Sequence, residues 1–194
     1  MPALRALFVK LSSLGDVIHH FPAVSDLRAH RPEIAVEWAV EEAYAPLVRL
    51  HPAVAVAIPV ALRRLKKGPL APSAWTALAA VRRQLRERPY DWIVDTQGLL
   101  KSVAVARLAR GPLFGYDRRS IRERSAARFY DQALAVPRNL HAVERNRRLV
   151  GAVFGYEPGG PPDYGLAAPG QAPDWAPTGR YVVALHATSR RDKR

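Results

Sequence analysis

Short apolar segments alternate along the chain with segments in which apolar residues recur at a helical period. The apolar segments predict strands at Leu4–Leu11, Val54–Val60 and Trp92–Asp95, and alternating apolar and polar residues predict a strand at Ile34–Val40. Apolar residues at three- and four-residue steps predict helices that begin at Val17 and that span Ala74–Arg88, Leu99–Arg110 and about His141–Phe154. A proline in the second turn of the first helix, Pro22, predicts a kink or a short first turn. Strands alternating with helices in this way predict an α/β fold, a doubly wound parallel sheet with helices on both faces.

The alternation stops at residue 155. Six prolines and six glycines fall within residues 155–179, which is the composition of an interdomain linker. The apolar segment Tyr181–Leu185 then predicts one more strand, and the sequence HATSRRDKR follows it. We therefore expect a first domain at residues 1–154, a linker at 155–179 and the first strand and loop of a truncated second domain at 180–194.

Composition excludes several classes of protein. Apolar residues make up 48% of the chain and charged residues 24%, so the chain can bury a core. It has no cysteine, which excludes a disulfide framework, a cysteine-ligated metal site and a cysteine nucleophile. The first residues lack the pattern of a signal peptide, and no apolar segment approaches the ~20 residues that span a bilayer. We expect a soluble, cytoplasmic protein.

Positive charge is concentrated in the middle of the chain. The net charge is +13, and residues 61–130 alone hold 16 basic and 5 acidic side chains. Such a basic region predicts an anionic partner, which is nucleic acid, a phospholipid surface, or a substrate with phosphates or carboxylates. The alternative is a solvated arginine-rich surface, since 25 of the 30 basic residues are arginine.

The junction after the first strand is the first candidate site. Open α/β sheets bind ligands at the carboxyl ends of their strands, and Gly15 and Asp16 lie there. Gly15 permits close backbone approach, but three glycines would be needed for a dinucleotide fingerprint. Asp16 has two interpretations, a helix N-cap or a general base at the mouth of the sheet. Residue type and position do not separate them.

Basic segments form the second candidate. Arg63, Arg64, Lys66 and Lys67 follow the third strand and precede Gly68-Pro69, and they are predicted to lie on a loop. There they can hold several phosphate or carboxylate groups or form a solvated surface. A second basic segment is predicted to complete an anion site if it folds beside the first, and it contains Arg118, Arg119, Arg122, Arg124 and Arg128.

Several chemistries are missing from the sequence. It holds no G-x-S-x-G elbow, no H-E-x-x-H helix and no Asp-x-Asp pair that would hold a divalent ion against a pyrophosphate. His19 and His20 point two ways on a helix, and His141 with Glu144 is interpreted as a helix start. We therefore expect neither a metal site nor a cofactor.

Six segments together resemble one family. In chain order they are LFVKLSSLGDVIHHFPAVSDL, VEWAVEE, IPVALRRLKK, DWIVDTQGLLKS, HAVERNR and LHATSRRDK. They resemble the ADP-heptose:lipopolysaccharide heptosyltransferases of glycosyltransferase family 9 over nearly all of residues 4–193. The branch that adds the first heptose fits better than the heptosyltransferase II branch, which stays the alternative. The family implies a GT-B architecture, in which two Rossmann-like domains face a cleft.

The resemblance implies a reaction and roles for residues. Heptose would pass from ADP-heptose to the inner Kdo of Kdo2-lipid A, with inversion and without a metal. Asp16 matches the catalytic base, which moves its interpretation from a cap towards catalysis. The positions that match acceptor-binding residues are Ser13, Gly15, Arg63, Arg64, Lys66, Lys67, Lys101 and Arg122. Those that match donor-phosphate ligands are Thr188, Ser189 and Lys193, with Ser189 where the family usually has threonine.

The implied partners fit the charge distribution. Kdo2-lipid A is rich in phosphates and carboxylates, and its acyl chains stay in a membrane. The resemblance therefore implies a protein that is peripheral on the cytoplasmic face of the inner membrane, against an anionic surface. Nucleic acid is the disfavoured alternative, because the basic segments lack interleaved aromatic residues and a known motif. With only the start of a donor domain, we expect the chain alone to be inactive.

Overall fold

A parallel sheet forms the centre of the protein. The computed structural model describes residues 4–67 and 72–166. Its six strands are all parallel and lie in the order β3-β2-β1-β4-β5-β6. They are β1 (Leu4–Val9), β2 (Ile34–Glu41), β3 (Val54–Val60), β4 (Trp92–Asp95), β5 (Leu113–Tyr116) and β6 (Gln132–Leu134). This order is that of a Rossmann-like sheet and confirms the predicted fold class.

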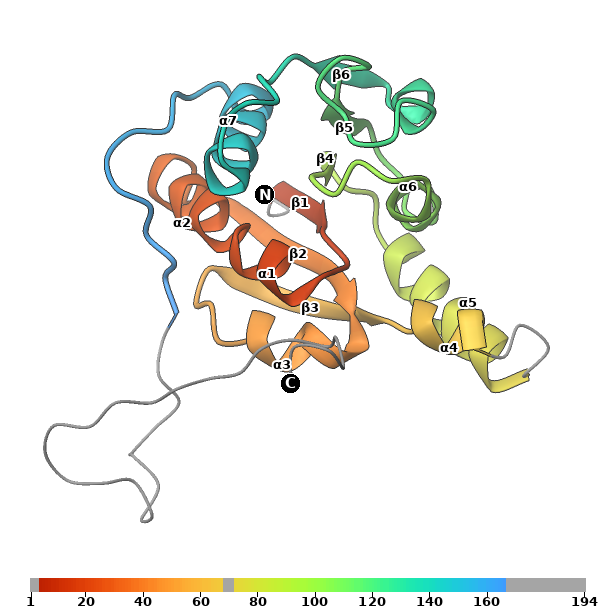
Figure 1. Ribbon diagram of the computed structural model, residues 1–194. Coiled ribbons are helices and arrows are strands. Elements are labelled where there is room, and N and C mark those ends of the chain that lie inside the picture. Colours follow the sequence, from red (N-terminus) through yellow and green to blue (C-terminus); the bar gives the residue numbers. More distant parts are fainter. Residues whose placement is uncertain (1–3, 68–71, 167–194) are drawn as a thin grey trace, which may run out of the picture.

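Helices cover both faces of the sheet, as predicted. The described helices are α1 (Leu14–Ile18), α2 (Phe21–His30), α3 (Ala45–Val48), α4 (Leu62–Lys67), α5 (Pro72–Arg86), α6 (Leu100–Ala106) and α7 (Ala142–Phe154), with 3-10 turns η1 (Glu42–Tyr44) and η2 (Ala126–Phe129). Figure 1 shows α2 and α7 on one side of the sheet and α5 and α6 on the other. None of the helices in the described part of the chain is long and apolar enough to cross a membrane.

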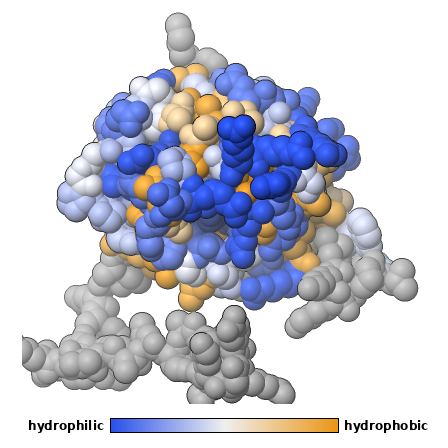
Figure 2. Space-filling view, turned by 45° about the horizontal axis from the view of Figure 1, so that its top comes forward, coloured by the Kyte–Doolittle hydropathy of each residue, from blue (hydrophilic) through white to orange (hydrophobic). Residues whose placement is uncertain are grey.

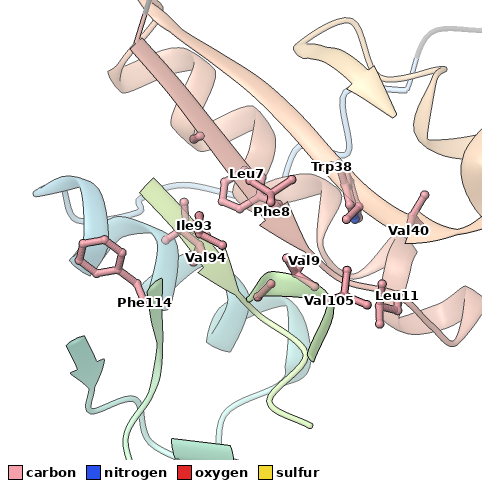
Figure 3. Packing of buried hydrophobic residues seen from close by; sticks show 14 of the residues in the cluster. Leu7, Phe8, Val9, Leu11, Trp38, Val40, Ile93, Val94, Val105 and Phe114 are labelled. Carbon is pink, nitrogen blue, oxygen red and sulfur yellow. The ribbon is translucent and has the colours of Figure 1, made fainter. Parts of the chain in front are cut away.

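The core lies around the central strands. Leu7 and Phe8 on β1 and Trp38 on β2 are fully buried, and Ile93 on β4 is nearly so. Figure 3 shows these side chains packed across the strands. Because central parallel strands are buried on both faces, residues 6–9 of β1 and 92–94 of β4 are continuously apolar. This is why these two segments were recognisable as strands.

Several elements differ from the sequence prediction. The strands β5 and β6 were not predicted, because Gly115 interrupts the four residues of β5 and β6 has only three residues. The basic segment at 63–67 was read as a loop, but it lies in α4. The first predicted helix is two helices, and Pro22 lies in the first turn of α2, where a missing N–H costs nothing.

The beginning of the predicted linker packs against the domain. Gly155 ends α7 in the left-handed conformation, with φ of 76°. Tyr156 stacks on His30 with ring centroids 4.2 Å apart. Residues 155–166 thus lie along α2 and α7 (Figure 1). The rest of the linker and the predicted strand Tyr181–Leu185 lie outside the described residues.

Candidate active site at the switch point of the sheet

Two adjacent pockets lie at the carboxyl edge of the sheet. Strand order reverses between β1 and β4, and open α/β sheets bind ligands at this point. The switch-point pocket has a volume of about 320 Å³ and is lined by Lys10, Asp16, Thr96, Gln97, Tyr116, Arg122, Arg138, Ala142, Arg145 and Asn146. The outer pocket, of about 370 Å³, is lined by Ser12, Ser13, Asp16, Gln97, Leu99, Lys101, Arg122 and Glu123. Asp16, Gln97 and Arg122 line both.

The loop after β1 is held by residues that follow β4. The Gln97 side-chain oxygen accepts the backbone N–H groups of Leu11 at 3.0 Å and of Ser12 at 3.2 Å. The Lys101 ammonium group donates to Ser12 Oγ at 3.0 Å. Since these bonds join the loops after two adjacent strands, they fix the position of the β1 loop that carries Asp16.

Asp16 closes the first turn of α1. The helix begins at Leu14 with Ser13 as its N-cap, so Asp16 is the third helical residue and not the cap itself. Its Oδ2 accepts the Ser13 N–H at 2.9 Å and the Ser13 hydroxyl at 3.3 Å. No described residue donates a hydrogen bond to Oδ1. The carboxylate is therefore oriented through one oxygen while the other can accept a proton.

A buried aspartate shapes the floor beside Gln97. Asp95 ends β4, and its Oδ1 accepts the backbone N–H groups of Gln97 and Gly98 at 2.9 and 3.2 Å. Its Oδ2 accepts the hydroxyls of Ser102 at 2.8 Å and Tyr130 at 2.9 Å. Burial raises the pKa of the Asp95 carboxyl, and these hydrogen bonds oppose the rise. Asp95 holds the loop after β4 and does not line either pocket.

Lys10 is a buried cation at the base of the switch-point pocket. Its side chain is 6% exposed, and Nζ donates to the Thr96 carbonyl at 2.8 Å and to Asn146 Oδ1 at 3.4 Å. Within the described residues no carboxylate lies within salt-bridge distance of it. Burial lowers the pKa of Lys10 to about 8, although the charges of Asp16 and Asp95 oppose the fall.

Lys10 makes the stability of the fold depend on pH. Its pKa is lower in the folded chain than the ordinary 10.5, so the folded chain binds fewer protons between about pH 8 and pH 10.5. Burying the charged Lys10 ammonium group therefore lowers the free energy of unfolding by roughly 3 kcal/mol below pH 8, and this loss disappears as the pH rises to 10.5. Relative to Lys10→Met, the wild-type free energy of unfolding should rise by up to about that amount over this range. Urea unfolding at both pH values measures it, and an unchanged difference would contradict the assignment.

Three arginines line the remaining wall. The Arg145 guanidinium donates to the Ser120 carbonyl at 2.5 Å and lies 4.8 Å from the centroid of the Tyr116 ring. Its Nε and the hydroxyl of Thr96 are buried without a hydrogen-bond partner among the described residues. Arg122 and Arg138 line the same pocket, which thus holds four cationic groups and one carboxylate. Figure 2 shows the molecule turned so that the side with β5, β6 and α7 comes towards the viewer. Hydrophilic residues occupy the middle of this face.

This arrangement can bind an anionic molecule and remove a proton from it. Cationic side chains with incompletely used donors favour phosphates and carboxylates, and an oriented carboxylate beside them can act as a general base. Among the described residues, no group of three histidine, aspartate or glutamate side chains is placed to hold a metal ion.

Comparisons with known proteins identify the family. Residues 78–194 match the model of glycosyltransferase family 9 (heptosyltransferase). The lipopolysaccharide heptosyltransferase 1 of Pseudomonas aeruginosa is 43% identical over 193 residues, which is 96% of this chain and 53% of that protein. The chain belongs to glycosyltransferase family 9. The Escherichia coli K12 protein of the same name is 40% identical, over 98% of this chain and 60% of its own length.

Solved structures of the family share the fold. The E. coli heptosyltransferase WaaC with ADP is similar with a TM-score of 0.80 and 40% identity, over 84% of this chain and 51% of that one. The E. coli ADP-heptose lps heptosyltransferase II has a TM-score of 0.54 at 17% identity, which shows the fold alone. The chain spans 53% to 61% of the length of four curated relatives that it matches. The resemblance read from six segments is confirmed.

The structure of this family 9 chain brings five of the twelve predicted site residues together. Ser13, Asp16, Lys101 and Arg122 line the two pockets. Gly15 lies in the same turn, and a Cβ added there would meet nothing within 4 Å, which leaves the space open for a ligand.

The predicted residues of α4 lie apart from these pockets. Arg63 donates to the Tyr44 hydroxyl at 2.7 Å, and Arg64 forms a two-bond ion pair with Glu42. Neither lines the pockets at Asp16, and of the second basic segment only Arg122 does. Lys66 and Lys67 end α4, and their side chains are outside the described part, as are Thr188, Ser189 and Lys193.

Sequence reasoning missed most of the wall of the switch-point pocket, in which only Asp16 and Arg122 were predicted. Lys10, Thr96, Gln97, Arg138 and Arg145 were not predicted as site residues. All but Arg138 lie inside the segments that carry the family resemblance. A lysine directly after the apolar residues 6–9 was also a signal, because burying an ammonium group is costly.

The histidines behave as predicted. His141 is the N-cap of α7 and accepts the Val143 N–H at 3.3 Å. Glu144 pairs with Arg148 one turn later on the same helix. His19 packs against the His141 ring, whereas His20 lies between Phe8 and Trp38 in the core.

Proposed function

We propose that this chain is the acceptor-binding part of a lipopolysaccharide heptosyltransferase. The proposed reaction moves L-glycero-D-manno-heptose from ADP-heptose to the inner Kdo of Kdo2-lipid A, with inversion and without a metal. Residues 1–154 would bind the acceptor, 155–179 would link the domains, and 180–194 would begin the donor-binding domain. In support, relatives about 40% identical bear this name, and the E. coli enzyme was solved with ADP and with ADP-2-deoxy-2-fluoro heptose.

One observation carries the proposal, the position of Asp16 between two pockets with cationic walls. The acceptor supplies carboxylates and phosphates, which Lys10, Lys101 and Arg122 would bind. Its hydroxyl would then lie against Asp16 Oδ1, the oxygen that receives no hydrogen bond from the described residues. This geometry suits a base that acts on an anionic acceptor.

The proposed reaction needs one general base and one leaving group. The acceptor hydroxyl loses its proton to Asp16 Oδ1 as its oxygen bonds to the anomeric carbon of heptose. The bond between that carbon and the donor phosphate breaks from the opposite face, and ADP leaves. Thr188, Ser189 and Lys193 are proposed to hold the donor phosphates and stabilise the developing charge. Since base and phosphate ligands would lie on different domains, domain closure would complete the site.

The acceptor also implies a location. Its acyl chains would remain in the inner membrane, so the enzyme would work as a peripheral protein on the cytoplasmic face. Anionic lipids there attract each basic residue near the surface by about 1 kcal/mol. The net charge of +13 is consistent with such a surface.

Arg122 gives a test of the acceptor site. It lines both pockets, is exposed, and its guanidinium forms no hydrogen bond with a described residue. Arg122→Ala should therefore raise the acceptor KM by about tenfold, the loss of one charge-assisted contact, with the donor KM unchanged. Steady-state kinetics of the full-length protein measures both constants. Arg28→Ala, an exposed arginine on α2, is the control, and equal changes in both KM values would contradict an acceptor role.

A further inference from the structure

The outer half of α5 is a poorly covered part of the molecule. Val81 and Leu85, both in the second half of the helix, are buried, and the helix contacts β3. In the first half Trp75 is 55% exposed, more than any other large apolar side chain in the described residues. A groove of about 500 Å³ also lies between α5 and the end of β3. An exposed tryptophan on such a helix suggests that something else covers this surface.

Helices α4 and α5 carry a large excess of positive charge. Their sequences together contain seven lysines and arginines and no acidic residue. Arg82, Arg83 and Arg86 are all exposed on α5. The groove itself is lined by two arginines and two glutamates, so its charges balance. Arg82 and Arg86 do not line the groove, so the positive charge of α5 does not converge on a small anion there.

The chemistry of this surface fits a lipid bilayer. Tryptophan favours the boundary between headgroups and acyl chains, because its ring is apolar and its N–H is polar. Basic residues around it are attracted by anionic headgroups. A nucleic acid would be met by several stacked aromatic rings, whereas α4 and α5 offer a single aromatic residue in the described part.

The position of the helices agrees with this partner. α4 follows β3 and thus starts at the carboxyl edge of the sheet, the edge that holds both pockets (Figure 1). The Arg63 N–H donates to Glu41 Oε1 at 3.3 Å. The Glu41 N–H donates to the Leu11 carbonyl at 3.1 Å, and the Leu11 N–H binds Gln97, which lines the outer pocket. Glu41 therefore lies between α4 and the outer pocket.

We propose that α4 and α5 together form a membrane-contact arm, which rests on an anionic bilayer with Trp75 at the level of the headgroups. The arm deepens the proposed association with a membrane and rests on the proposed function for the choice of that membrane. A bilayer at this edge would present its headgroups towards the outer pocket, so an acceptor embedded in lipid could reach Asp16 while its acyl chains stay in place.

Vesicle binding by the full-length protein tests the arm. Vesicles of phosphatidylethanolamine and phosphatidylglycerol, without any acceptor, should bind the protein, and pure phosphatidylcholine should not. Trp75→Ala should weaken binding about tenfold, and Arg82→Gln with Arg83→Gln about 30-fold. Tyr164→Ala, an exposed aromatic residue on the linker at the opposite side of the domain, is the matched control and should bind as wild type.

Tryptophan fluorescence gives a second test of the arm, which does not depend on a variant losing its affinity for vesicles. Brominated lipids should quench the part of the emission that disappears in Trp75→Phe. Absence of that quenching, or equal affinity of wild type and Trp75→Ala, would overturn the arm. Transfer to an acceptor dispersed in detergent should be unchanged in Trp75→Ala. If transfer is present while vesicle binding fails, the arm alone is wrong, and if transfer is absent while vesicles bind, the proposed function is wrong.

Discussion

Asp16→Asn in the full-length protein should lower kcat for heptose transfer by at least about 100-fold. The asparagine oxygen can still accept the Ser13 N–H that now binds Oδ2 at 2.9 Å, so the first turn of α1 should persist. What the variant loses is the ability of the other oxygen to take up a proton. Initial rates at saturating donor and acceptor measure the effect, and the circular dichroism melting curve checks the fold.

A second aspartate provides the control for this experiment. Asp163 also accepts a backbone N–H, that of Gly165 at 2.9 Å, but it lies on the linker segment and lines neither pocket. Asp163→Asn should therefore transfer heptose as wild type does. If Asp16→Asn keeps its turnover with an intact fold, the proposed base is wrong and the proton goes elsewhere.

Arg147→Met should lower the free energy of unfolding by about 3–5 kcal/mol. The Arg147 side chain is only 5% exposed, and its guanidinium pairs with both carboxylate oxygens of Asp26 on α2, at 2.7 and 3.1 Å. It also donates to the carbonyls of Gly159 and Gly160 in the linker. Methionine would fill similar space and leave a buried carboxylate and two carbonyls without their donor. Urea unfolding of the variant and the wild type gives the difference.

The neighbouring arginine is a matched control on the same helix. Arg148 forms an ion pair with Glu144 at 2.6 Å, but its side chain is 48% exposed. Exposed pairs contribute little because water screens them, so Arg148→Met should cost less than about 1 kcal/mol. Equal losses in the two variants would mean that the Asp26 contact does not join α7, α2 and the linker as described.

The central sheet was predictable from sequence because its strands are buried on both faces. Leu7 and Phe8 belong to a continuous apolar segment, and so does Ile93. Strand β5 was missed because Gly115 interrupts its apolar residues, and β6 was missed because three residues are too few to show a period. Their pairing rests on contacts from elsewhere, such as the Leu113 N–H donated to Asp131 Oδ2 at 2.8 Å.

In the candidate site, the sequence predicted only residues that lie close after a recognisable strand. Asp16, Ser13 and Lys101 follow recognisable strands, so their place at the carboxyl edge could be read from the chain. Arg138 and Arg145 line the switch-point pocket with Asp16, although they lie more than 100 residues from it in the sequence and are brought there by the crossover to β6 and α7. Such a juxtaposition depends on strand order, which composition and periodicity do not contain.

Helix α4 was not predicted, although its sequence has the apolar spacing of a helix. Leu62 and Leu65 are one turn apart in LRRLKK, a spacing that suits a short helix. The interpretation as a basic loop gave weight to the four charges and to the Gly68-Pro69 pair that follows them. As a helix, the segment holds Arg64 against Glu42 and away from Asp16.

The most direct test of the account is heptose transfer itself. ADP-heptose and Kdo2-lipid A would be incubated with the full-length protein, and the acceptor mass followed by mass spectrometry. We predict a gain of one heptose, with no second addition, in the presence of a metal chelator as well as in its absence. A folded protein that leaves the acceptor mass unchanged would contradict the proposed function, and transfer only to a different lipopolysaccharide core acceptor would contradict the proposed acceptor.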